Sequence, residues 1–133
     1  MTASFRGMTV LVIRNEQLNL LTESARERWL AQHVKRCFPD FAEKLQPSEL
    51  LDFIRRNRRR AIPYFQSEAG VSLYIDLVCL LGEGFSDDPR LPWARDILTN
   101  SSIDETQRRV MLYSRARAHL LGPIPQGRIR RSA

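Results

Sequence analysis

The sequence contains few of the residues from which catalytic and metal sites are built. Its 133 residues include only two cysteines and two histidines. Cys37 and Cys79 belong to no Cys-x-x-Cys motif, so we expect free, buried thiols, with neither a disulfide nor a metal pair. His33 and His119 lie outside any metal-binding or catalytic motif, and we interpret both as structural. No catalytic, cofactor-binding or metal-binding residue is predicted, and the protein is expected not to be an enzyme.

Long apolar runs are also missing. No stretch approaches the roughly 18 consecutive apolar residues that a bilayer span requires. The apolar run from Met8 to Ile13 is about half as long as the core of a signal peptide, and no small-residue cleavage site follows it. We therefore expect a cytoplasmic protein with no membrane partner. Hydrophobic residues make up 43% and charged residues 27% of the chain, which is typical of a globular protein with one domain.

Helical periodicity is the main pattern between residues 10 and 121. Apolar residues spaced three to five apart predict an amphipathic helix of about 20 residues from Asn15, ended by Pro39. Pro47 suits the first turn of a second helix. A third helix, over residues 68–81, is nearly all apolar and is expected to be the buried central helix. Ser67 is a suitable N-cap for it.

Two further helices are predicted after a loop rich in turn-forming residues. Pro92 begins a short fourth helix, and a fifth ends near Leu121, with Ser102 or Asp104 as its N-cap. The predicted fold class is therefore all-α, a compact single-domain bundle of about five helices. The predicted organisation is an N-terminal arm (1–9), a helical domain (10–121) and a flexible basic tail (122–133).

The net charge of +6 is concentrated in two places. Five arginines lie between residues 55 and 60, and three more lie in the tail; without these eight, the chain carries a small negative charge. On a helix, Arg55 and Arg59 share one face, as do Arg56 and Arg60, while Arg58 points towards the apolar side.

These arginines permit three interpretations. They can form a solvated helix face in which one buried arginine pairs with a carboxylate. They can bind an acidic protein surface through Arg55, Arg56, Arg59 and Arg60. They can also bind nucleic acid, although sequence-independent binding needs several phosphate contacts on one surface, and no motif is present to organise them. Nucleic acid is the least favoured of the three.

Asp88 and Trp93 are two more candidates for binding a partner. Asp88 precedes a proline in a loop, where turn formation explains it better than a cation site. Trp93 follows Pro92 at a helix start, where an amphipathic ring can anchor a partner, although core packing is favoured. Four other aromatic residues are too widely spaced for a base-stacking platform and are expected in the core: Trp29, Tyr74, Phe85 and Tyr113.

The segment from Ser67-Glu68 through Tyr74 to Asp88-Pro89-Arg90-Leu91-Pro92-Trp93-Ala94 resembles a group of small bacterial proteins associated with type VI secretion. The resemblance covers about residues 10–121, and its most specific part is the Asp-Pro-x-x-Pro-Trp-Ala stretch. It implies an accessory role, as a chaperone, co-chaperone or adaptor that loads an effector, and brings no catalytic residues. The implied partner is an effector, its chaperone, or a spike or PAAR component.

Two other functions stay open as hypotheses. One is an immunity protein that neutralises a cognate toxin, although such proteins often use an acidic surface and this chain carries a basic one. The other is a nucleic-acid-binding protein that uses residues 55–60 and the tail. Neither the binding face nor self-association can be read from the sequence.

Overall fold

The computed structural model describes residues 23–122. Its regular secondary structure over that range consists of helices only, as the sequence predicts. Its helices are α3 (Glu23–Cys37), α4 (Pro39–Glu43), α5 (Pro47–Ala61), α6 (Glu68–Leu81), α7 (Pro92–Leu98) and α8 (Glu105–Leu121), with a 3-10 turn, η1 (Phe85–Asp87). The predicted N-terminal arm, the predicted start of the first helix and the basic tail after Gly122 lie outside the described residues.

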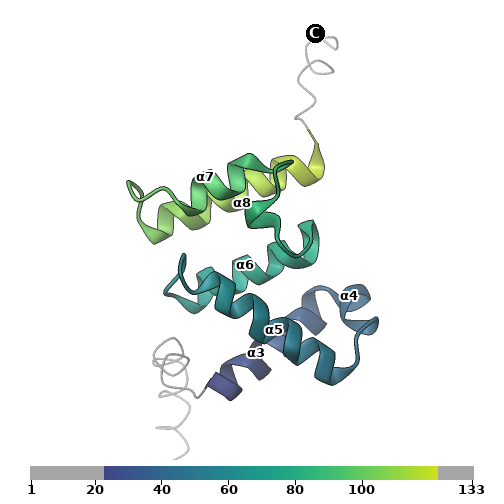
Figure 1. Ribbon diagram of the computed structural model, residues 1–133. Coiled ribbons are helices and arrows are strands. Elements are labelled where there is room, and N and C mark those ends of the chain that lie inside the picture. The colour runs from purple at the N-terminus through teal and green to yellow at the C-terminus, as the bar shows by residue number, and fades with distance from the viewer. Residues whose placement is uncertain (1–22, 123–133) are drawn as a thin grey trace, which may run out of the picture.

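Helix α6 occupies the centre of the fold, as its apolar sequence predicts (Figure 1). Helices α3, α4 and α5 lie on one side of it and α7 and α8 on the other. A helix that is apolar on nearly all sides must be covered on more than one side to remove its side chains from water. This arrangement places α5, which carries the arginines, and α7, which carries Trp93, on opposite sides of the molecule.

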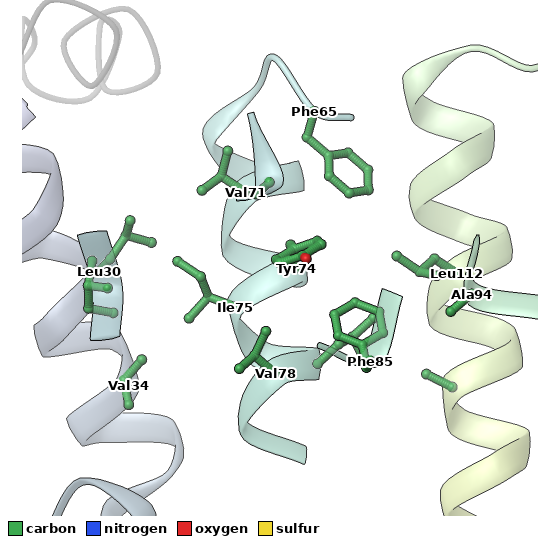
Figure 2. Packing of buried hydrophobic residues seen from close by; sticks show 14 of the residues in the cluster. Leu30, Val34, Phe65, Val71, Tyr74, Ile75, Val78, Phe85, Ala94 and Leu112 are labelled. Atoms are coloured by element: carbon green, nitrogen blue, oxygen red, sulfur yellow. The ribbon is translucent and has the colours of Figure 1, made fainter. Parts of the chain in front are cut away.

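The core is continuous across α6 (Figure 2). Ile75 and Val78 face Leu30 and Val34 of α3, while Tyr74 lies with Phe65 and Phe85 on the side towards α8. The Tyr74 and Phe85 rings lie 4.9 Å apart in a tilted arrangement, which is a favourable aromatic geometry. The two halves of the bundle are therefore joined through the side chains of one helix.

Local signals in the sequence begin and end several helices where predicted. Ser67 caps α6, because its Oγ accepts a hydrogen bond of 3.0 Å from the Gly70 N–H. Gly82 follows α6 with a φ of 103°, a conformation that favours glycine. Pro47 and Pro92 occupy the first turns of α5 and α7.

Two local predictions were wrong or incomplete. Pro39 ends α3 but also begins α4, a five-residue helix that the sequence pattern did not indicate. Of the two proposed N-caps for α8, Asp104 takes the role: its carboxylate accepts the Gln107 N–H, and the Gln107 side chain accepts the Asp104 N–H. Ser102 lies in the preceding turn and makes no cap, because Asp104 is adjacent to the first helical residue.

Three residues expected inside the protein are exposed. Trp29 is 38% exposed and stacks on His33, and Tyr113 is 57% exposed on α8. Cys37, at the last position of α3, is also exposed, whereas Cys79 is partly buried; both thiols are free. Each exposed side chain lies on a helix face that the described part of the chain leaves uncovered, which spacing alone does not reveal.

Candidate functional site

The arginines of α5 are largely compensated by carboxylates from other elements. Arg55 donates to Glu27 of α3 at 2.9 Å. Arg56 donates two hydrogen bonds to Glu83, and Arg60 a third at 3.3 Å. Since Glu83 follows the end of α6, this one carboxylate joins two arginines to the central helix. Little uncompensated positive charge is left here to bind an external anion.

The remaining two arginines of this run differ sharply in exposure. Arg58 is buried, as its position beside Ile54 predicts, and its Nη1 lies 3.2 Å from the exposed carboxylate of Glu23. Arg59 is exposed and makes no ion pair with the described residues. This is the arrangement of the first interpretation above, a solvated helix face with one buried, paired arginine. Of the four predicted partner-binding arginines, Arg59 alone has no ion pair within the described structure, while Arg56 and Arg60 share the one carboxylate of Glu83.

Asp88 and Trp93 are also engaged within the protein. Asp88 accepts the Arg90 backbone N–H at 2.9 Å and its guanidinium at 2.8 Å, which closes a turn. Trp93 is half-buried against α8, where the Arg115 guanidinium lies 5.8 Å from the ring centre. The His119 ring lies 6.0 Å from the same ring. Helix α7, which carries Trp93, lies on the opposite side of α6 from α5, and Asp88 follows η1, which packs against α7.

Acid is expected to weaken the fold through Glu83. Its hydrogen bond with Arg56 holds its pKa below the ordinary value of 4.5. A carboxylate whose pKa is lower in the folded state favours folding above the unfolded pKa, and this contribution is lost as the pH falls through the folded pKa. Urea denaturation at about pH 6 and about pH 3 should therefore show a smaller pH dependence for Glu83→Gln than for the wild type. An equal dependence in both proteins would contradict this role.

Asp88 is also expected to stabilise the fold less as the pH falls, but over a lower pH range than Glu83. Hydrogen bonds from the Arg90 side chain and backbone lower the pKa of Asp88 to about 2. Its stabilising effect is thus present above its ordinary pKa of 3.8 and is lost towards pH 2. Asp88→Asn, measured in the same way, should reduce the pH dependence mainly below about pH 4.

The feature best suited to bind a partner is an apolar groove between α6 and α8, with a volume of about 290 Å³. From α6, the lining residues lie at positions i, i+3, i+4 and i+7, so they share one face of the helix. The groove is lined by Phe38, Leu73, Asp76, Leu77, Leu80, Tyr113, Ala116, Arg117, Leu120 and Leu121. The sequence analysis identified none of these residues as a binding candidate.

Helix α8 leaves most of its apolar residues in contact with solvent. Of its 17 residues only Leu112 and Ala116 are buried. Tyr113, Leu120 and Leu121 are exposed by 57%, 43% and 71%, and all three line the groove. Exposed apolar side chains are common singly, but a contiguous set along a groove is typical of an interaction surface.

Polar contacts at the start of α8 hold this helix against the segment before α6. Glu105 accepts the Gln66 N–H at 2.7 Å and hydrogen bonds from both the backbone and the hydroxyl of Ser67. The Arg108 guanidinium donates to the Tyr64 carbonyl at 3.1 Å. These bonds tie the N-terminal ends of α6 and α8 together, and the groove lies between the later turns of the same two helices.

The polar residues of the groove differ in their partners. Asp76 accepts a hydrogen bond of 2.8 Å from His33 Nε2, and burial raises the pKa of this carboxyl group. Arg117 lines the opposite wall and makes no ion pair with the described residues. The groove therefore combines an apolar floor with one uncompensated positive charge at its edge.

A second hollow, of about 460 Å³, lies among α4, α5 and α6. The Arg56–Glu83 ion pair lies in its lining, beside Phe41, Phe53 and Cys79. Burial raises the pKa of the Cys79 thiol to about 12, so this sulfur stays protonated and unreactive near neutral pH. The hollow offers fewer apolar side chains to a partner than the groove.

Other classes of site were sought in the described part of the chain. Residues 23–122 contain no group of three or more histidine, cysteine or acidic side chains placed to hold a metal ion. None of the helices in this range is long and apolar enough to cross a membrane. Comparison of the chain with protein-family models, curated proteins and solved structures finds no match.

A signal for the groove exists in the sequence, but it is ambiguous. Val110, Tyr113, Arg117, Leu120 and Leu121 recur at helical spacing and form one stripe along α8. Such a stripe normally predicts a face that packs into the core. The stripe that packs instead contains Leu112 and Ala116, and the chain has no further described helix to cover the first one.

Proposed function

We propose that this protein is a non-enzymatic accessory protein that binds a protein partner in the groove between α6 and α8. The observation that carries the proposal is the row of exposed apolar side chains along this groove, Leu80, Tyr113, Leu120 and Leu121. Covering such side chains removes apolar surface from water, which is the main driving force of protein association. The site has no nucleophile, metal ligand set or phosphate-binding loop among its lining residues.

The occupant we propose is an amphipathic helix of the partner protein. The groove runs between two helices and is mostly apolar, the form into which the apolar face of a third helix packs. Its volume of about 290 Å³ is just below the roughly 300–1,000 Å³ typical of small-molecule sites. Arg117 at the edge favours a helix that carries a carboxylate beside its apolar side chains.

The partner we propose is a type VI secretion effector, its chaperone, or a spike or PAAR component. This assignment rests on the resemblance described above, carried by residues such as Asp88, Pro92 and Trp93. An effector must be kept folded and attached to the spike in the cytoplasm before it is fired. A rigid helical protein that covers an apolar helix of the effector or adaptor meets that need without any catalytic group.

The arginines of α5 add little to this function in our proposal. Arg55, Arg56 and Arg60 are paired with Glu27 and Glu83, so they serve chiefly to join α3, α5 and the end of α6. Binding to nucleic acid, which needs several unpaired cations on one surface, is correspondingly less favoured.

The first test is co-purification of the tagged full-length protein with the products of its neighbouring genes, followed by the mass of the complex. We expect a stoichiometric complex with one of them. A protein that remains alone with every neighbouring product overturns the accessory role. Protection of cells that express a neighbouring toxin would instead favour an immunity protein.

The second test locates the binding face. Leu80→Glu and Leu120→Glu each place a charge in the groove and should weaken the complex by about thirtyfold or more, the effect of losing a central apolar contact. Ile62→Glu is the matched control, because Ile62 and Leu80 are both 47% exposed and Ile62 lies at the end of α5, outside the groove. Isothermal titration calorimetry gives the affinities. If Ile62→Glu weakens binding and the groove variants do not, the groove is the wrong face.

A further inference from the structure

A cysteine, a histidine and a carboxylate from two helices form a connected row beside the groove. Cys37 Sγ lies 3.8 Å from His33 Nδ1, one helical turn earlier on α3. The other ring nitrogen of His33, Nε2, lies 2.8 Å from Asp76 Oδ1 on α6. The sequence analysis treated these residues separately, because 43 positions separate His33 from Asp76.

The carboxylate decides which nitrogen of His33 carries the proton. An ionised Asp76 can only accept a hydrogen bond, so the proton of a neutral His33 lies on Nε2. The lone pair of Nδ1 then faces the Cys37 sulfur and can accept its proton. The Trp29 ring stacks on the imidazole at 5.7 Å with an interplanar angle of 8°, which further restrains the ring.

The two cysteines of the chain differ in access. Cys37 is exposed, at the end of α3, so a reagent in solution can reach its sulfur. Cys79 is partly buried, and burial raises the pKa of its thiol to about 12. The thiolate is the reactive form of cysteine, so Cys79 serves as an internal comparison of low reactivity.

The geometry also limits the class of reaction. Acyl transfer requires backbone or side-chain donors that stabilise an oxyanion next to the nucleophile. The N–H that follows Cys37, that of Phe38, is already bonded to the Val34 carbonyl at 2.7 Å. Thiol–disulfide exchange needs no oxyanion donors, only a thiolate and access to it.

We propose that Cys37 is a site of thiol–disulfide exchange with low-molecular-weight disulfides, assisted by His33 and positioned by Asp76. His33 Nδ1 takes the thiol proton, and the Cys37 thiolate attacks one sulfur of the disulfide. A new S–S bond forms to Cys37 as the old one breaks, and the leaving thiolate takes the proton from His33. The Cys37 sulfur is oxidised and the departing sulfur is reduced. This inference is independent of the partner proposed above.

The test uses the full-length protein and dithionitrobenzoate, an aromatic disulfide whose released thiolate is measured by absorbance at about pH 7. We expect one fast-reacting thiol per chain, placed at Cys37 by mass spectrometry of the mixed disulfide. Cys37→Ser should remove the fast phase, and Cys79→Ser should keep it. His33→Gln should slow it by about tenfold or more. Asp76→Asn should slow it less, because the imidazole remains.

The pH profile distinguishes assistance from simple exposure. Two kinds of charged residue lie near the row: Arg117 of α8 lines the same groove as Asp76, and Lys35 and Arg36 share the last turn of α3 with Cys37. Loss of His33 should move the rise in rate to higher pH, which a purely structural role would not do.

Comparing the wild type in its native and urea-unfolded states tests the proposal even if the variants fail to fold. Cys37 of the native wild type should react faster near pH 7 than the same cysteine in urea, where the row is broken. Equal or slower reaction in the native state overturns the proposal. So does a His33→Gln protein that keeps its helical circular dichroism spectrum and reacts as fast as the wild type.

Discussion

Tyr74→Ala is expected to lower the free energy of unfolding by about 3–5 kcal/mol, the range found when a buried aromatic side chain is removed from a core. Tyr74 is 1% exposed and lies at the centre of α6. Its ring lies 4.9 Å from that of Phe85 and 6.4 Å from that of Tyr64. Truncation leaves a cavity between the two halves of the bundle, which the surrounding helices can fill only in part.

The control for this prediction is Tyr74→Phe. It keeps the ring and removes the hydroxyl, whose oxygen lies 3.1 Å from Ser86 Oγ. We expect a loss of about 1 kcal/mol, the net value of one buried hydrogen bond. Urea denaturation followed by circular dichroism measures both variants. Equal losses in the two would show that the hydroxyl, and not the packing of the ring, stabilises this part of the core.

Gly70→Ala is expected to destabilise the protein by about 1–3 kcal/mol, the usual effect of overpacking. In an exposed helix the same change stabilises by up to about 1 kcal/mol. Here an added Cβ would lie 2.5 Å from Phe65 Cδ1 and 2.6 Å from Phe65 Cβ. Phe65 is 1% exposed, and its Cβ is attached to the backbone, so a change of rotamer cannot relieve the contact.

Ala69→Gly is the matched control, since Ala69 lies in the same turn and is exposed. It should cost no more than about 1 kcal/mol, through backbone entropy alone. The two adjacent positions thus favour opposite residues, alanine at 69 and glycine at 70. Thermal denaturation measures both variants, and a Gly70→Ala protein more stable than the wild type contradicts the close packing of α6 on Phe65.

The helices were predictable where a short stretch of chain contains its own signal. Ser67 caps α6, and Pro47 and Pro92 begin their helices, because each acts on backbone groups within one turn. The N-cap of α8 was ambiguous, since Ser102 and Asp104 both carry suitable oxygens. Only the position at which the helix begins made Asp104 the cap.

The ion pairs of the α5 arginines could not be predicted from local sequence in the same way. Helical geometry correctly turned Arg58 towards Ile54. It could not show that Arg55, Arg56 and Arg60 are paired, because their carboxylates are 23 to 28 residues away in the chain. Nor could it show that α7, which carries Trp93, lies on the opposite side of α6 from α5.

Local patterns in the sequence were enough to predict that this protein is helical, where most of its described helices begin and end, and that α6 is its centre. Those properties depend on hydrogen bonds within one turn and on the period of apolar residues along one helix. Which apolar stripes are covered depends on how the helices pack against one another. Leu112 of α8 is buried while Leu120 is exposed, and Cys37 meets Asp76 through His33. The reason is that the groove, and the row formed by Cys37, His33 and Asp76, each involve α6 and a second helix. The spacing of apolar residues along one helix does not specify how it packs against another.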